Sequence, residues 1–63
     1  SLERDLEAGW PARAEPRGGR VLVTVRYRGG ERSAWLSPAE YRLLLASPAA
    51  RAALEPGAGG PGT

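Results

Sequence analysis

The clearest pattern in the chain is a period-two alternation of apolar and polar residues between positions 21 and 36. The segment VLVTVRYR is rich in β-branched residues, Gly29-Gly30 follows it, and the segment ERSAWL comes next. This composition predicts two antiparallel strands joined by a two-residue turn at Gly29-Gly30.

The position of the turn fixes which residues lie opposite each other. The predicted pairs run from Arg28–Glu31 to Val23–Leu36, and a slip by one residue would exchange the two faces. The face predicted to be buried carries Val21, Val23, Val25, Tyr27, Ala34 and Leu36. The face predicted to be exposed carries Leu22, Thr24, Arg26, Arg28, Ser33 and Trp35.

Capping patterns predict three short helices around this hairpin. The first, residues 1–9, has Ser1 as its cap, Gly9 at its end, and Leu2 and Leu6 on one face. The second, residues 37–46, starts with Ser-Pro-Ala-Glu, and the third starts at Ser47 and ends before Pro56. Residues 10–20, WPARAEPRGGR, lack periodicity and are predicted to be a loop.

These elements predict an α+β fold, a small β-hairpin packed against short helices in the order α-β-β-α-α. We divide the chain into a short N-terminal helix with a Pro/Gly-rich linker (1–20), a hairpin and two-helix module (21–55), and a disordered tail or linker (56–63). The chain has 63 residues and no Cys or His, so neither disulfides nor a zinc site stabilises it. A two-stranded hairpin is marginal in water and has open edges, which favours pairing with another chain.

Residues 35–45, WLSPAEYRLLL, follow the predicted strands and resemble the start of the winged-helix effector domain of response regulators. In that family a strand leads into a helix with the pattern Leu-Thr/Ser-Pro-x-Glu-Phe/Tyr-x-Leu-Leu. The resemblance covers eleven residues, and the chain then departs from the family, since no recognition helix and C-terminal wing fit between Ala46 and Thr63. The family's function is therefore not carried over.

The composition has two explanations that stay open. All nine basic residues are Arg, which suits bidentate recognition of phosphate or carboxylate. The absence of Lys, Asn, Ile and Phe also indicates a GC-rich bacterial source, where Arg simply replaces Lys. The chain begins at Ser1 without Met, so we expect a processed chain or an excised domain. It has no signal-peptide pattern and no apolar run of membrane length, and we expect it to be cytoplasmic.

Few residues are suited to catalysis. Without His or Lys only a carboxylate or a Tyr could activate a serine, and Ser37 and Ser47 are better explained as helix caps. The acidic residues of the first helix lack the spacing of a calcium loop, and the glycine pairs are not phosphate loops. We predict a chain that is not an enzyme, with no catalytic residues, no cofactor and no metal.

Positive charge is concentrated on the hairpin and its approach, with five arginines against one glutamate in residues 16–36. The hypothesis is a protein-interaction module with an acidic partner or a second copy, because Trp and Arg are enriched at interface hot spots. The alternative is nucleic-acid binding, with arginines on phosphates and a stacked aromatic ring. A third interpretation packs Trp35 in the core, under the first helix. The predicted binding residues are Leu22, Arg26, Arg28, Arg32 and Trp35.

Overall fold

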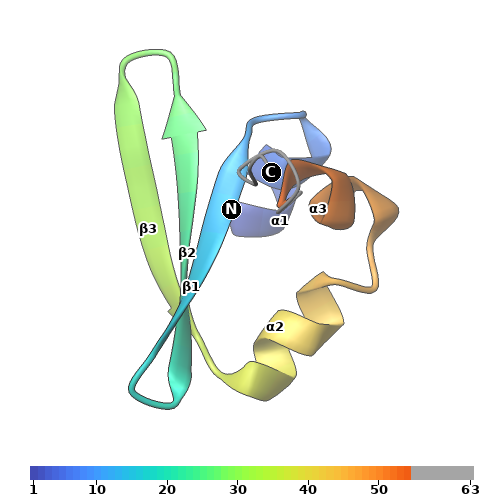
Figure 1. Ribbon diagram of the computed structural model, residues 1–63. Helices are drawn as coiled ribbons and strands as arrows, with labels where there is room; N and C mark the ends of the chain where they lie inside the picture. The colour runs from blue at the N-terminus through green and yellow to red at the C-terminus, as the bar shows by residue number, and fades with distance from the viewer. Residues whose placement is uncertain (55–63) are drawn as a thin grey trace, which may run out of the picture.

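The computed structural model describes residues 1–54, which form a three-stranded antiparallel sheet with three short helices on one side (Figure 1). The predicted α+β class is confirmed, and the order has one strand more than predicted, α-β-β-β-α-α. The predicted tail, residues 56–63, lies outside the described residues. The elements are α1 (Leu2–Glu7), β1 (Ala12–Arg17), β2 (Arg20–Tyr27), β3 (Gly30–Leu36), α2 (Pro38–Leu44) and α3 (Pro48–Ala53).

Strand β1 corrects the prediction of a loop over residues 10–20. Ala12–Arg17 pairs with β2, and Gly18 and Gly19 form the turn with φ of 53° and 80°. Two central residues with positive φ are typical of a type I′ turn, whose twist matches that of the flanking strands. The strand tolerates Pro16 because β1 is at the edge of the sheet.

The predicted β2–β3 hairpin forms, but its turn lies one residue earlier. Tyr27 is opposite Gly30, so Arg28 and Gly29 make the turn and Gly30 belongs to β3. Val23 consequently pairs with Ala34 and not with Leu36. The pairing is displaced by two residues, an even number, so every strand residue keeps the face predicted for it.

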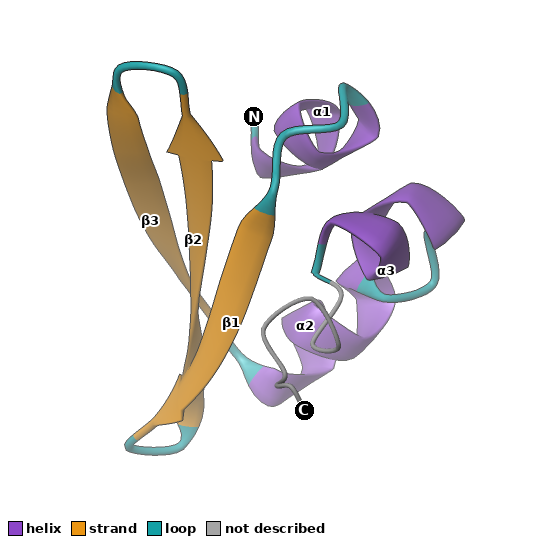
Figure 2. Cartoon of the chain, turned by 45° about the horizontal axis from the view of Figure 1, so that its top comes forward, coloured by secondary structure: helices purple, strands orange, loops and turns teal. Residues whose placement is uncertain are grey.

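The core lies between the helices and the side of the sheet that they cover (Figure 2). Val23 and Val25 on the central strand have no more than 1% of their surface exposed, and Leu6 of α1 is buried against them. Helix α1 also packs on α3. The buried cluster comprises Leu6, Val23, Val25, Leu44, Ala50 and Leu54.

Each helix starts at the predicted serine. The hydroxyls of Ser1, Ser37 and Ser47 each accept a hydrogen bond from the amide three residues later. At α2 the Glu40 carboxylate also accepts from the Ser37 amide at 2.8 Å, which completes a capping box. Within residues 1–54 no helix has the length and apolar content needed to cross a membrane.

Candidate interaction surface

One side of the sheet carries the helices, and no described helix covers the other side, which we call the outer sheet face. The strand register places alternate residues of all three strands there. These residues are Arg13, Glu15, Arg17, Arg20, Leu22, Thr24, Arg26, Glu31, Ser33 and Trp35.

An apolar patch with a stacked guanidinium lies on this face. Trp35 on β3 is directly opposite Leu22 on β2, and the Trp35 residue is 50% exposed. The Cζ atom of Arg20 lies 5.9 Å from the centroid of the Trp35 ring, within the range of a cation–π interaction. A large aromatic ring is thus held on a rigid sheet and remains accessible to a partner.

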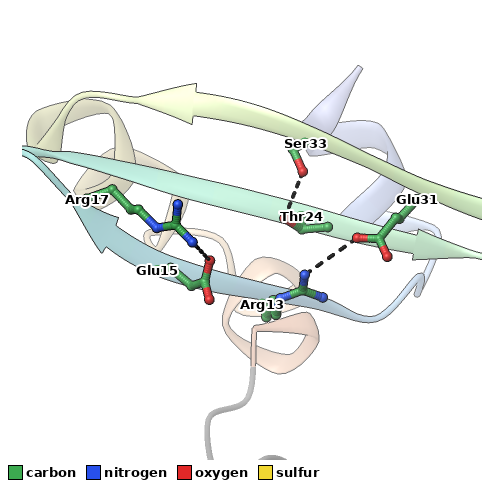
Figure 3. A network of polar contacts seen from close by, with 6 residues as sticks. All are labelled: Arg13, Glu15, Arg17, Thr24, Glu31 and Ser33. Atoms are coloured by element: carbon green, nitrogen blue, oxygen red, sulfur yellow. Dashed lines mark hydrogen bonds and ion pairs between the residues drawn. The ribbon is translucent and has the colours of Figure 1, made fainter.

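Polar contacts link the three strands beside this patch (Figure 3). The hydroxyls of Thr24 and Ser33 are 2.8 Å apart, and Thr24 is only 3% exposed. Two exposed ion pairs, Arg13–Glu31 and Arg17–Glu15, each have 3.5 Å between nitrogen and oxygen. Exposed pairs contribute about 0–1 kcal/mol to stability, so their main effect is to place carboxylates among the arginines.

The structure overturns the interpretation that packs Trp35 in the core. Trp35 points to the outer sheet face, whereas the core and α1 lie on the opposite side. The tryptophan that joins the core is Trp10, whose ring meets that of Tyr27 edge-on with centroids 5.4 Å apart.

The structure brings only some of the predicted binding residues together. Leu22, Arg26 and Trp35 share the outer sheet face. Arg28 lies in the β2–β3 turn. Arg32 is opposite Val25, so its side chain is on the helix-facing side of the sheet.

Sequence reasoning missed three arginines on this face, two on β1 and one at the start of β2. Arg13 and Arg17 were assigned to a loop, and Arg20, which stacks on Trp35, was placed before the first strand. The signal was present in residues 12–17, where small residues alternate with Arg and Glu up to Gly18-Gly19. The prediction of a loop rested on the Pro and Gly residues of 10–20 and missed this alternation, in which one face carries only Ala and Pro.

The polar groups on the helix-facing side form one notable contact. The Tyr27 hydroxyl donates a hydrogen bond to the carboxylate of Asp5 on α1. This bond, with burial and the negative charge of Asp5, raises the pKa of Tyr27 above its ordinary value, and the positive charge of Arg32 opposes the rise. Among residues 1–54 no Ser or Thr hydroxyl is hydrogen-bonded to a carboxylate, and no cluster of acidic side chains is arranged to hold a metal ion.

No family model, curated protein or solved structure matches the chain. None of these comparisons supports the resemblance of residues 35–45 to response-regulator effector domains; in the structure these residues run from the end of β3 through α2.

Proposed function

We propose that this chain is a small non-catalytic module for protein–protein interaction, which binds its partner through the outer sheet face. The observation that carries the proposal is the half-exposed Trp35 beside Arg20 and Leu22 on an uncovered sheet. Trp and Arg are the residue types most enriched at interface hot spots, particularly where they lie at the centre of a patch.

The surface is preorganised, which favours binding. The hydrogen bond between Thr24 and Ser33 connects the central strand to β3 beside the patch, and the Arg20 guanidinium packs over the Trp35 ring. Side chains that are already ordered lose less conformational entropy when a partner binds.

The charge of the face favours an acidic partner. Four arginines, at positions 13, 17, 20 and 26, outnumber the two glutamates at 15 and 31. The existing ion pairs are exposed and weak, so carboxylates of a partner compete for the same guanidinium groups. Arg28, in the adjacent turn, extends this positive charge.

We further propose a cytoplasmic location.

Nucleic-acid binding is the second candidate, because an arginine stacked on a tryptophan also provides a platform for a base. Glu15 and Glu31 count against it. They lie on the same face as the arginines and form ion pairs with two of them, which leaves this face a net charge of +2, small for a surface that has to neutralise several successive phosphates.

A comparison of variants tests the proposal. Tagged wild-type chain, Trp35→Ala and the control Leu43→Ala are used to capture partners from cells that produce the chain. Leu43 is 75% exposed on α2, and removal of its side chain leaves the outer sheet face unchanged. We expect a partner that wild type and Leu43→Ala retain and Trp35→Ala loses, with all three chains folded by circular dichroism. Equal capture by all three would contradict the proposal.

A titration with mixed-sequence single- and double-stranded nucleic acid separates the two candidates. Trp fluorescence and anisotropy are followed at low and physiological salt. No binding at either salt concentration supports the protein-interaction module. Tight binding that weakens steeply with salt would favour the nucleic-acid alternative, and the slope would count the arginines engaged.

A further inference from the structure

The two edges of the sheet differ in what their backbones present. The Arg26 amide donates to the Pro11 carbonyl at 2.9 Å, so the backbone of Arg26 faces β1. Successive residues of an antiparallel strand face opposite neighbours. Val25 and Tyr27 therefore face β3. By the same alternation, the β3 residues opposite them and further along, Gly30, Arg32, Ala34 and Leu36, face β2. The residues in between, Glu31, Ser33 and Trp35, point their amides and carbonyls away from β2.

The same alternation makes Ala12, Ala14 and Pro16 the outward-facing residues of β1. Pro16 has no amide hydrogen, so that edge is interrupted. All three outward-facing residues of β3 can both donate and accept. No described helix runs along the outer side of this strand in Figure 1 or Figure 2. Such an edge is a template for another strand.

We propose that β3 pairs antiparallel with β3 of a second copy of this chain, about a twofold axis at Ser33. In this register Ser33 faces Ser33 of the second copy, and Glu31 faces Trp35. Every outward-facing residue then has a partner, whereas a displacement by two residues in either direction leaves some of them unpaired. A twofold contact of this kind is closed and forms a dimer.

The side chains around this edge favour the same partner. On the helix-facing side, Arg32 of the second copy lies beside Ala34 of the first. Ala34 lines a groove of about 330 Å³ between α1, α2 and β3 that also contains Glu3, Glu7 and Glu40. None of these glutamates is ion-paired within residues 1–54. The dimer thus brings an arginine to an acidic groove. No like charges lie directly opposite each other, and the two Arg32 residues, which are diagonal across the axis, each lie beside the glutamates of the other copy.

The groove has an apolar floor that includes Leu36, and Leu43 at its side is largely exposed. The aliphatic stem of Arg32 packs on such a floor while its guanidinium reaches the carboxylates. This proposal concerns the strand edge and the helix-facing side, so it does not depend on the function proposed for the outer sheet face.

Substitutions at the two edges test the proposal, with light scattering after size exclusion and sedimentation velocity as readouts. We expect wild type at twice the 6.6 kDa mass of the chain at high concentration. Ser33→Pro removes one outward-facing amide and should give the single-chain mass. Ser33→Ala, which loses the hydroxyl contact with Thr24 but keeps the amide, should stay dimeric. Ala14→Pro, which blocks the other edge, should also stay dimeric.

A charge reversal provides a test that does not alter the strand backbone, in case Ser33→Pro fails to fold. Arg32→Glu should weaken the dimer at least tenfold, and combining it with Glu3→Arg and Glu7→Arg should restore much of the affinity. A wild-type chain that stays monomeric at millimolar concentration would overturn the proposal. So would a dimer that Ala14→Pro or Trp35→Ala disrupts while Ser33→Pro and Arg32→Glu do not.

Discussion

Each of the two hairpin turns contains glycine, but only one of them requires it. Gly18 and Gly19 have φ of 53° and 80°, in the left-handed region, where an L-residue costs roughly 1–2 kcal/mol. Gly29 has no positive φ, and a Cβ placed on it meets no atom within 4 Å. The β1–β2 turn therefore depends on its glycines, whereas the β2–β3 turn depends on its strands.

We expect Gly19→Ala to lower the free energy of unfolding by about 1 kcal/mol. Gly29→Ala should change it by less than about 0.5 kcal/mol, as is usual for an unstrained surface position. Urea denaturation followed by circular dichroism compares the two variants with wild type. Similar losses in both variants would show that the turns do not differ in this way.

The hydrogen bond from Tyr27 to Asp5 makes a second prediction at this scale. Because the pKa of Tyr27 is raised in the folded chain above its ordinary value of 10.0, the folded state holds the phenol proton more tightly than the unfolded state does. The stabilisation is fully present below pH 10.0 and is lost as the pH rises through the folded pKa. The free energy of unfolding should thus decrease as the pH rises above 10.0.

Ultraviolet titration of phenolate absorbance measures this effect in a Tyr41→Phe background, where Tyr27 is the remaining tyrosine. We expect Asp5→Asn to lower the pKa of Tyr27, because it removes the charged acceptor. Glu3→Gln serves as the control, since Glu3 is on the same helix and is not bonded to Tyr27. An unchanged pKa in Asp5→Asn would contradict the assigned cause.

Among the secondary-structure elements, helix α1 is one of the shortest. It has six residues, too few for a stable isolated helix, so its structure depends on docking. Leu6 is 1% exposed and belongs to the core cluster. The helix is therefore maintained by Leu6 in the core, by Leu2 packed beside it, and by the hydrogen bond from Tyr27 to Asp5.

We expect Leu6→Ala to cost about 2–5 kcal/mol, the usual range for a buried leucine. Domains of this size have only about 3–5 kcal/mol available, so the variant should be largely unfolded or lose α1. Leu43→Ala, at a 75% exposed position on α2, should leave the melting temperature within a few degrees of wild type. Thermal melts followed by circular dichroism compare the melting temperatures of both variants with that of wild type. A stable Leu6→Ala chain would show that α1 docks by other contacts.

The helix starts and the two faces of the hairpin were predictable because each rests on local chemistry. A Ser-Pro-Ala-Glu start specifies a capping box in the sequence itself, and alternation specifies a face even when the register is displaced by two residues. Strand β1 was not predictable in the same way. Its helix-facing residues are Ala12, Ala14 and Pro16, and their strand conformation comes from pairing with β2 and not from propensity.

The binding residues were predicted correctly only where local alternation was sufficient to place them. Trp35 and Leu22 were placed together correctly because they belong to one alternating hairpin. Arg20 was missed because its contact with Trp35 crosses between neighbouring strands, and such a diagonal contact depends on the exact register.

At the scale of the whole molecule, the sheet separates two environments of different charge. Arginines predominate on the outer sheet face, whereas Glu3, Glu7 and Glu40 gather on the helix side around an apolar groove. The four Arg and two Glu of the outer sheet face carry the whole formal net charge of +2, because the remaining five Arg and five acidic residues balance. The two tryptophans lie on opposite sides of the same sheet and report on each side separately.

Single-tryptophan variants measure this asymmetry in dilute solution. In Trp10→Phe the remaining Trp35 is 50% exposed, so its emission should be red-shifted and readily quenched by acrylamide. In Trp35→Phe the remaining Trp10 packs edge-on against Tyr27 and the core, and quenching should be markedly weaker. Iodide should increase the contrast, because the arginines around Trp35 attract an anion and added salt screens that attraction. Equal quenching of both tryptophans by acrylamide would mean that the outer sheet face is covered in solution, and the binding surface would have to be sought elsewhere.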